Sequence, residues 1–226
     1  CSTIGEALCL GAMAVEAGYA ANVMSMASSH FASAEKQFRF PLEYGNQRPF
    51  SSTWTVTGCG SFILGKKGGH VRITGATPGK IVDMGLKDSM NMGACMAPAA
   101  CDTICRNLED FGRRPEDYDR IITGDLGEVG QKILLDFMRS SGYDLEGLHM
   151  DCGIEIFDKE TQDTHAGGSG CGCSAVVLAA CIVPKLASGE WRRVLFVPTG
   201  ALMSSTSYNE GQSVPGIAHG IVLEHC

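Results

Sequence analysis

The chain has 226 residues, of which 44% are hydrophobic, and its formal net charge is −7. This is the composition of an ordinary globular protein, and an acidic chain without a run of about five or six basic residues is not expected to bind nucleic acid. Its apolar runs fall short of the roughly 18 residues that a membrane span needs, so we expect no transmembrane segment.

The N-terminal quarter predicts a helix, a strand and a long connection. Residues 1–18 are small and apolar, with Glu6 and Glu16 as the only charges, which predicts a helix buried on most sides. Residues 20–30 predict a short buried strand that ends in a polar turn. Residues 30–55 have mixed polarity without a sustained period, so we expect them to run over the surface.

The middle of the chain predicts two strands and a long helix. Residues 60–65 and 70–77 are expected to be strands joined by the turn "KKGG". Residues 95–112 predict a helix with Pro98 in its first turn and Gly112 as its stop.

Strands and helices alternate in the remainder. Residues 115–125 predict an acidic turn and a strand, and residues 130–142 a helix. Residues 165–201 contain a glycine-rich turn, a buried helix and a buried strand, and residues 216–225 predict a last strand. This alternation indicates an α/β architecture in which helices cover a mixed sheet.

An internal repeat divides the chain. A Cys-Ser pair begins each of two buried helices, a glycine ends each helix, and a buried strand follows each one. The matching positions are Cys1, Cys9 and Gly18 in the first unit and Cys173, Cys181 and Gly189 in the second. We therefore predict two similar halves, residues 1–114 and 115–226. The alternative is that two buried helix–strand units look alike by chance.

The two predicted halves are unequal at their starts. A strand–helix–strand segment, residues 115–172, precedes the second repeat unit, whereas nothing comparable precedes the first. We therefore expect the chain to begin inside a longer protein, to lack the start of its first half, and to expose sheet edge and apolar helix surface. The alternative is an N-terminal-nucleophile hydrolase in which self-processing exposes Cys1.

The chain contains eleven cysteines, an odd number, and no CxxC pair. Most have small or apolar neighbours, which is typical of reduced thiols used as small core residues. Cys101 and Cys105 are one helical turn apart, and Cys171 and Cys173 flank a glycine, but neither pair has a histidine set at zinc spacing. We expect an intracellular, reducing location and no metal site.

A cysteine at the start of a buried helix, in a chain with two repeated α/β halves, resembles the thiolase and ketoacyl-synthase superfamily. The resemblance implies two βαβαβαββ halves layered α-β-α-β-α, with Cys1 made reactive by the helix N-terminus. It also implies a first histidine at His149, at the end of a strand. Where related synthases carry "GN", this chain has Gly168 and Ser169.

Longer phrases carry a closer resemblance. The words "SSHFASAEKQFRFPLEYGNQRP", "DSMNMGACMAPAACDTI", "PEDYDRIITGDLGEVG" and "HAGGSGCGCSAVV" resemble the stage V sporulation protein AD family of endospore-forming bacteria. That resemblance implies a protein that binds dipicolinic acid (pyridine-2,6-dicarboxylate) and helps to load it into the developing spore. It further implies a homodimer when intact, peripheral to the spore inner membrane and working with the other proteins of its operon. No cofactor is expected, and calcium only as the ligand's counter-ion.

The candidate ligand site combines helix starts, histidines and arginines. A planar dianion suits the free N–H groups at the helix starts at Cys1 and near Cys173. Histidine side chains would donate hydrogen bonds and an arginine a bidentate fork. The candidate residues are Cys1, His149, Asp151, Gly168, Ser169, His219 and either Arg39 or Arg48.

Two other functions compete with ligand binding. The first is an active acyl-transferring condensing enzyme with Cys1 as nucleophile and His149 as base. The second is a docking subunit at the spore membrane, in which the catalytic set is vestigial.

Overall fold

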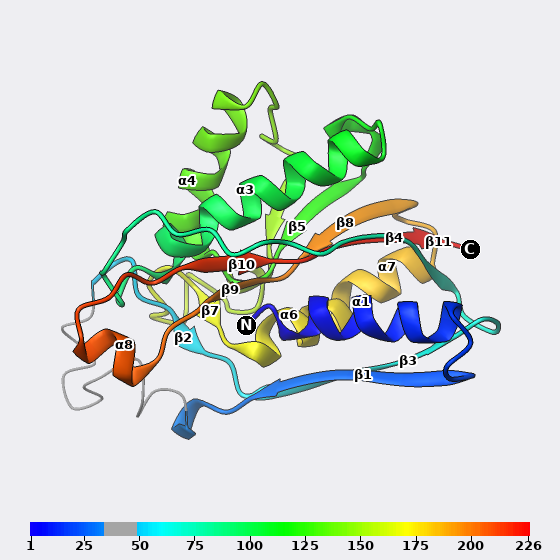
Figure 1. The fold of residues 1–226 in the computed structure, drawn as a ribbon, viewed down its shortest axis with the longest axis horizontal. Helices are drawn as coiled ribbons and strands as arrows, with labels where there is room; N and C mark the ends of the chain where they lie inside the picture. Colours follow the sequence, from blue (N-terminus) through cyan, green and yellow to red (C-terminus); the bar gives the residue numbers. More distant parts are fainter. Residues whose placement is uncertain (34–48) are drawn as a thin grey trace.

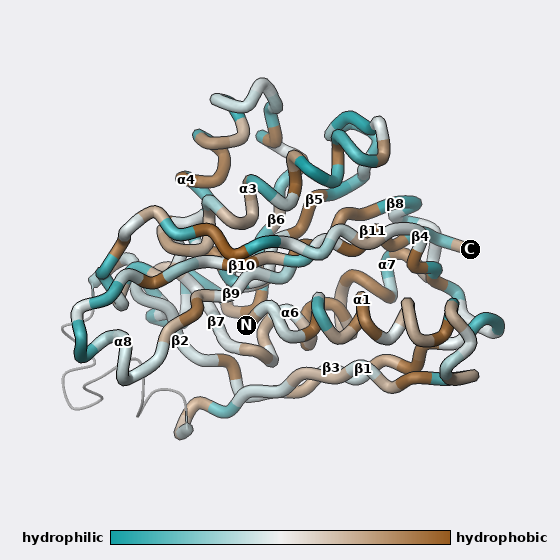
Figure 2. The backbone as a smooth tube through the Cα atoms, viewed as in Figure 1, coloured by the Kyte–Doolittle hydropathy of each residue, from teal (hydrophilic) through white to brown (hydrophobic). Residues whose placement is uncertain are grey.

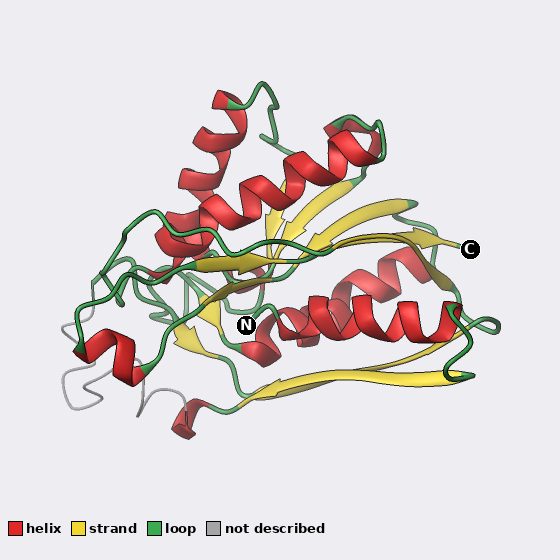
Figure 3. Ribbon diagram, viewed as in Figure 1, coloured by secondary structure: helices red, strands yellow, loops and turns green. Residues whose placement is uncertain are grey.

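The computed structural model describes residues 1–33 and 49–226, which lie in four layers (Figure 1). Helices α3 and α4 cover one face of a five-stranded sheet. Helices α1, α6 and α7 cover its other face and separate it from the β1–β3 pair. Figure 3 shows the same alternation of red helices and yellow strands. Arg39 and Arg48, two candidate ligand residues, lie outside the described residues.

The bounds of the elements follow. The helices are α1 (Thr3–Glu16), α3 (Met92–Asp110), α4 (Gly127–Ser140), α5 (Cys152–Glu155), α6 (Cys171–Val177), α7 (Val183–Ala187) and α8 (Ser205–Asn209), with a 3₁₀ turn η2 (Pro115–Asp117) and a π turn η3 (Leu178–Ile182). The strands are β1 (Asn22–Ser29), β2 (Trp54–Thr55), β3 (Gly58–Gly65), β4 (Val71–Thr77), β5 (Arg120–Thr123), β6 (His149–Asp151), β7 (Gly168–Ser169), β8 (Arg193–Val197), β9 (Thr199–Ala201), β10 (Gly216–Ala218) and β11 (Gly220–His225). None of the helices in the described part of the chain is long and apolar enough to cross a membrane.

The five-stranded sheet has the strand order β4-β11-β8-β5-β6. Strand β5 is parallel to β6 and β8, whereas β11 is antiparallel to β8 and β4. Because helices cover both faces, the central strand β8 is a continuous apolar run whose last four residues have no exposed surface. Hydrophobic colour accordingly follows β5 and β8 through the centre of the molecule (Figure 2).

The β1–β3 pair corrects two expectations. The strands at 60–65 and 70–77 form no hairpin, because β3 pairs with β1 and β4 pairs with β11. Strand β1 is also not buried on both faces: Ser25 and Ala27 point inward, while Met24 and Met26 are 59% and 46% exposed. The small residues face the helices because α6 packs close: a Cβ at Gly60 would lie 2.3 Å from the carbonyl oxygen of Ala175.

Helix α3 begins earlier than its sequence predicts. The side chain of Asn91 accepts a hydrogen bond from the N–H of Ala94, so the helix starts at Met92 and Pro98 lies in its second turn. Gly112, with a φ of 59°, ends the helix as expected. Helix α4 packs directly on the start of α3, since a Cβ at Gly93 would lie 2.3 Å from the carbonyl oxygen of Leu126.

The repeat is visible in the order of elements. Helix α1 is followed by the antiparallel pair β1 and β3, and the helix formed by α6, η3 and α7 is followed by the antiparallel pair β8 and β11. Strand β4 and helix α3, from residues 71–110, pack with the sheet of the second unit. The division at residues 114 and 115 stays a prediction.

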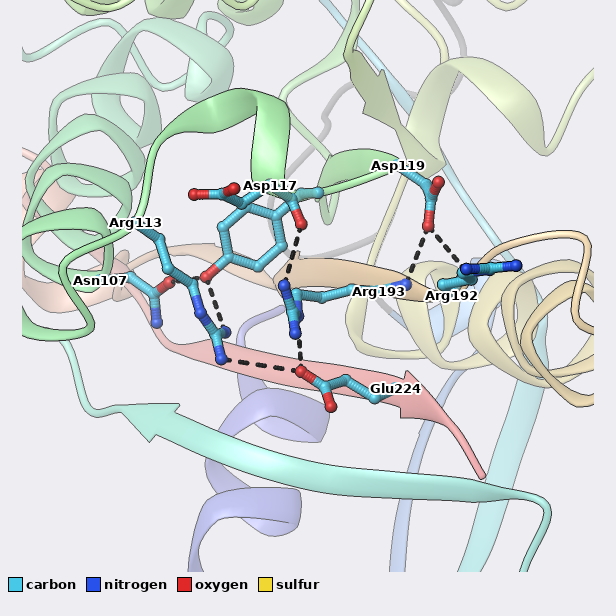
Figure 4. Close-up of polar contacts among 8 residues, drawn as sticks. Asn107, Arg113, Asp117, Asp119, Arg192, Arg193 and Glu224 are labelled. Atoms are coloured by element: carbon cyan, nitrogen blue, oxygen red, sulfur yellow. Dashed lines mark hydrogen bonds and ion pairs between the residues drawn. The ribbon is translucent and has the colours of Figure 1, made fainter.

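Ion pairs and hydrogen bonds fasten the end of the sheet at which β5 and β8 begin (Figure 4). Arg193 Nε donates to Glu224 Oε1 at 2.5 Å, and Arg113 Nη2 lies 3.7 Å from the same oxygen. Burial alone would raise the pKa of Glu224, but the bond and charge of Arg193 lower it overall. We call this group the Arg–Glu cluster; its residues are Asn107, Arg113, Asp117, Tyr118, Asp119, Arg192, Arg193 and Glu224.

Neutral and backbone groups complete the Arg–Glu cluster. Tyr118 Oη donates to Asn107 Oδ1 at 2.7 Å and accepts from Arg113 Nη1 at 3.3 Å. Asp119 Oδ2 accepts from the backbone N–H groups of Arg192 and Arg193 at 2.6 and 2.8 Å. The cluster therefore ties η2 and the loop before β8 to the end of β11.

Candidate functional site

Cys1 lies directly before α1, where the start of that helix meets β7, β9 and α6. Its Sγ is 4.0 Å from the Oγ of Ser169 on β7. Thr3 Oγ1 donates to Cys171 Sγ, at the start of α6, over 3.7 Å. On the β9 side, a Cβ at Gly200 would lie only 3.0 Å from the backbone nitrogen of Ser2. The structure thus brings together Cys1 and Ser169, two of the candidate ligand residues.

A buried carboxylate continues the contact between Cys1 and Ser169. Ser169 Oγ donates its one hydrogen to Asp125 Oδ2 at 2.6 Å, so it can only accept from the Cys1 thiol. Asp125 is 1% exposed and also accepts from the N–H of Gly170 at 3.1 Å and from Thr199 Oγ1 at 2.9 Å. The result is a directed chain from thiol to hydroxyl to carboxylate.

Asp151 forms a second buried carboxylate beside Asp125. Its oxygens accept from Thr123 Oγ1 at 2.6 Å and from three backbone N–H groups, those of Leu126, Gly127 and Gly153, at 2.9 to 3.0 Å. Burial raises the pKa of Asp151, these hydrogen bonds oppose the rise, and the nearby charge of Asp125 adds to it. Asp151 therefore fixes the loops after β5 and β6.

His149 is held by neighbours other than Cys1. Because Thr123 gives its hydroxyl hydrogen to Asp151, it accepts from His149 Nε2 at 2.9 Å. Gln131 Nε2 then donates to Nδ1 at 3.0 Å. Loss of hydration lowers the pKa of His149 to about 4, so the ring is neutral with both nitrogens engaged. Asp125, and not His149, is the ionisable group joined to Cys1 through Ser169.

His219 packs against the first turn of α1. A Cβ at Gly5 would lie 3.2 Å from the Cβ and the carbonyl oxygen of His219. Its Nδ1 accepts from the N–H of Gly79 at 3.1 Å, which leaves Nε2 as the protonated nitrogen of a neutral ring. Burial lowers the pKa of His219, and the charge of Glu6 opposes this. His219 thus lies beside the first turn of α1.

The two helix starts differ in what they offer an anion. In α1 the carbonyl of Ser2 accepts from the N–H groups of Gly5 and Glu6, and within residues 1–33 and 49–226 the N–H groups of Thr3 and Ile4 have no acceptor. At α6 the N–H of Gly170 is bound to Asp125 and that of Gly172 to Ser29 Oγ at 2.9 Å. These two N–H groups at the start of α6 are thus bound within the protein, and a ligand carboxylate there stays a prediction.

The remaining candidate, Gly168, is packed behind the site. Strand β7, which carries it, is parallel to β2, and a Cβ at Gly168 would lie 2.6 Å from Ile156 Cγ2. The backbone here leaves no room for a side chain, which accounts for the glycine.

Sequence reasoning missed the residues that surround the predicted ones. Asp125 accepts from Ser169 and from Thr199, and Thr123 and Gln131 hold His149. A signal was available: "TGD" and "PTG" lie at the ends of predicted strands, and polar residues at the ends of parallel strands meet at one edge of a sheet.

Among the described residues, no group of three or more histidine, cysteine or acidic side chains could hold a metal ion. The eleven cysteines are free thiols.

The layers and the cysteine at the start of a central helix define a thiolase-like fold. AbyA1, a tetronic acid condensing enzyme, superposes with a TM-score of 0.62 at 14% identity, over 99% of this chain and 66% of that one. 3-Oxoacyl-[acyl-carrier-protein] synthase III from Aquifex aeolicus VF5 gives 0.59 at 11% identity, over 100% of this chain and 65% of that one.

Sequence comparison identifies the family within that fold. The family model for stage V sporulation protein AD matches residues 1–224. The stage V sporulation protein AD of Bacillus subtilis (strain 168) is 45% identical over 224 residues, which are 99% of this chain and 66% of that protein. The chain therefore belongs to the stage V sporulation protein AD family and spans about two thirds of the length of this relative.

Proposed function

We propose that the protein binds dipicolinic acid at the start of α1 and assists its uptake into the developing spore. Family membership supports this, because the resemblance of the sequence to that family implies dipicolinate binding. The observation that carries the proposal is the Cys1–Ser169–Asp125 chain, in which the thiol contacts a hydroxyl and not an imidazole.

The same chain argues against acyl transfer. A nucleophilic thiol needs a base that takes its proton and donors that stabilise the oxyanion. Ser169 directs its hydrogen to Asp125 and is not free to donate to a substrate. Asp125 is not free to take the thiol proton, because it already accepts three hydrogen bonds.

An anion finds donors at α1. The N–H groups of Thr3 and Ile4, the helix dipole and the Nε2 hydrogen of His219 supply positive potential on one side of the site. Three hydrogen bonds to Asp125 spread its charge and weaken its repulsion. Arg39 and Arg48 remain the predicted partners of the second carboxylate, with calcium as a possible counter-ion of the ligand.

Calorimetric titration with dipicolinic acid, with and without calcium, tests the proposal on the full-length protein. Picolinic acid, which lacks one carboxylate, and isophthalic acid, which lacks the ring nitrogen, are the matched ligands. We expect saturable binding of dipicolinic acid that weakens at least about tenfold in Gly200→Val, whose side chain would press on Ser2. Absence of saturable binding by the folded wild-type protein refutes the proposal.

Asp125→Asn separates binding from catalysis. If a dianion binds beside Asp125, removal of the negative charge leaves affinity unchanged or increases it. If Asp125 serves an acyl-transfer reaction, the variant loses that activity. Asp136→Asn on the surface of α4, where Asp136 contacts Arg139 in an exposed ion pair, is the control.

The second candidate is an acyl-transferring condensing enzyme. The position of Cys1 at a helix start, in a fold shared with condensing enzymes, favours it. Incubation with acyl-coenzyme A followed by intact-mass measurement decides: an acyl adduct that disappears in Cys1→Ser would replace the binding proposal with this one.

The proposal extends to assembly and location. We propose a homodimer peripheral to the spore inner membrane, in contact with the other proteins of the dipicolinate-uptake operon. Light scattering of the intact protein tests the dimer, and co-sedimentation with spore inner membranes tests the location. Site variants that leave the dipicolinate content of spores unchanged would instead favour a docking subunit.

A further inference from the structure

Two thiols lie one turn apart on α3, on the face that packs against α4. Cys101 and Cys105 are both half-buried. Cys101 Sγ lies 3.9 Å from Ser141 Oγ, and Cys105 Sγ lies 3.9 Å from Met138 Sδ. The proposed function does not involve this pair of thiols.

We propose that Cys101 and Cys105 form a peroxide-sensitive dithiol, in which a hydroperoxide oxidises Cys101 and Cys105 converts the product to a disulfide within α3. The site is one of reversible covalent modification, separate from the start of α1. The adjacency of the two side chains on one helix face carries the proposal.

The surroundings of Cys101 favour its thiolate. The pairing with Cys105 lowers the pKa of Cys101, and Ser141 also lowers it. Burial and the charge of Asp102, which is paired with Lys80 at 2.8 Å, oppose this effect. The pKa of Cys105 is raised by the same pairing.

The other thiols with altered acidity are shifted the opposite way. Burial raises the pKa of Cys9 and of Cys95 to about 11, and it raises that of Cys152 well above its ordinary value. Because the thiolate is the nucleophile, oxidation is directed to Cys101 rather than to these sites.

The reaction balances in two steps. The Cys101 thiolate attacks one oxygen of the hydroperoxide, the O–O bond breaks, and water or an alcohol leaves after taking up a proton. Cys101 is now a sulfenic acid, oxidised by two electrons. The sulfur of Cys105 then attacks that of Cys101, the S–O bond breaks, the Cys105 proton goes to the leaving hydroxide, and water departs.

Helix geometry makes the product easy to reduce. Side chains one turn apart on a helix have Cβ atoms about 5–6 Å apart, whereas a disulfide prefers about 3.5–4.5 Å. The turn must therefore tighten, and a strained disulfide has a more oxidising potential than a relaxed one. Pro98 already removes one backbone N–H from the preceding part of α3, which makes that part easier to deform.

Peptide mass spectrometry of the intact protein after brief treatment with equimolar hydrogen peroxide tests the proposal. We expect residues 88–106 to lose two hydrogens, with fragments that assign the bond to Cys101 and Cys105 while Cys95 stays reduced. Dithiothreitol should restore the thiols. In Cys105→Ser a dimedone adduct should accumulate on Cys101, and in Cys101→Ser oxidation of this peptide should slow at least about tenfold. Cys59→Ser, which removes an exposed thiol, should change nothing.

Iodoacetamide labelling of the wild-type protein keeps the test decisive if a variant fails to fold. We expect Cys101 to be labelled at a lower pH than an ordinary thiol, because its pKa is lowered. Labelling of Cys101 no faster than that of Cys59 at pH 7, or oxidation of Cys101 while Cys105 stays a free thiol, would overturn the proposal.

Discussion

The two ends of the five-stranded sheet hold their charges in different ways. Where β5 and β8 begin, the Arg–Glu cluster pairs arginines with Glu224 in a partly exposed setting. Where the same strands end, Asp125 and Asp151 are each 1% exposed and are held by hydroxyl and backbone N–H groups. Arginine side chains balance the carboxylate charge at the first end, whereas hydroxyl and backbone N–H dipoles stabilise the carboxylates at the second.

This difference distinguishes a cluster that only joins segments from one that positions a functional site. A half-exposed ion pair can rearrange and is screened by salt, so it joins segments without demanding one geometry. A buried carboxylate without a cation needs each donor in place, because an unpaired buried charge costs several kcal/mol. The donors of Asp125 and Asp151 come from loops far apart in the chain, and this precision is what positions Ser169 beside Cys1.

The largest effect is expected at Asp151. In Asp151→Ala four donors lose their acceptor in the interior, and we expect the free energy of unfolding to fall by about 3–5 kcal/mol. Urea unfolding followed by circular dichroism measures this. Asp136→Asn, on the surface, should stay within about 0.5 kcal/mol of wild type. A loss below about 1 kcal/mol at Asp151 would remove the contrast between the two ends.

The second effect is a pH dependence caused by His149. Its folded pKa of about 4 lies below the ordinary value of 6.5, so the unfolded chain takes up the proton first as the pH falls. Stability is therefore complete above about pH 7 and is lost between roughly pH 6.5 and 4. From pH 7.5 to 5 we expect a loss of about 2 kcal/mol that is absent in His149→Gln. Equal losses in both proteins would show that His149 is charged when folded.

The third effect is a salt-dependent coupling in the Arg–Glu cluster. A double-mutant cycle with Arg193→Ala and Glu224→Ala should give a coupling of about 1 kcal/mol at low salt, which falls at 1 M salt. Denaturant unfolding of the four proteins measures it. A coupling as large as the loss at Asp151 would mean that both ends of the sheet are held alike.

The smallest effect is expected at Arg192. Within the cluster, Arg192 contributes only its backbone N–H, which donates to Asp119. Arg192→Ala therefore keeps that bond. Thermal unfolding should change by less than about 0.5 kcal/mol. A larger loss would assign the guanidinium a structural contact.

Local sequence patterns were enough for most elements. The helix of small residues before the strand at β1, the stop at Gly112 and the buried run of β8 follow from composition and spacing within each segment. They failed for strands β3 and β4. These strands are neighbours in the sequence and look like a hairpin, but they belong to different layers. In β1 the larger residues point outward because the helix beneath requires small ones.

The sequence by itself determined the family and the α/β alternation. Only the tertiary structure decided that Asp125 stands behind Ser169 while His149 turns to Thr123 and Gln131. Asp125 follows strand β5 and His149 lies in strand β6 of the same sheet. The sequence does not specify which of the two side chains faces the start of α1. That choice depends on contacts across 168 positions between Cys1 and Ser169 and across 44 between Ser169 and Asp125, which form only when the layers pack.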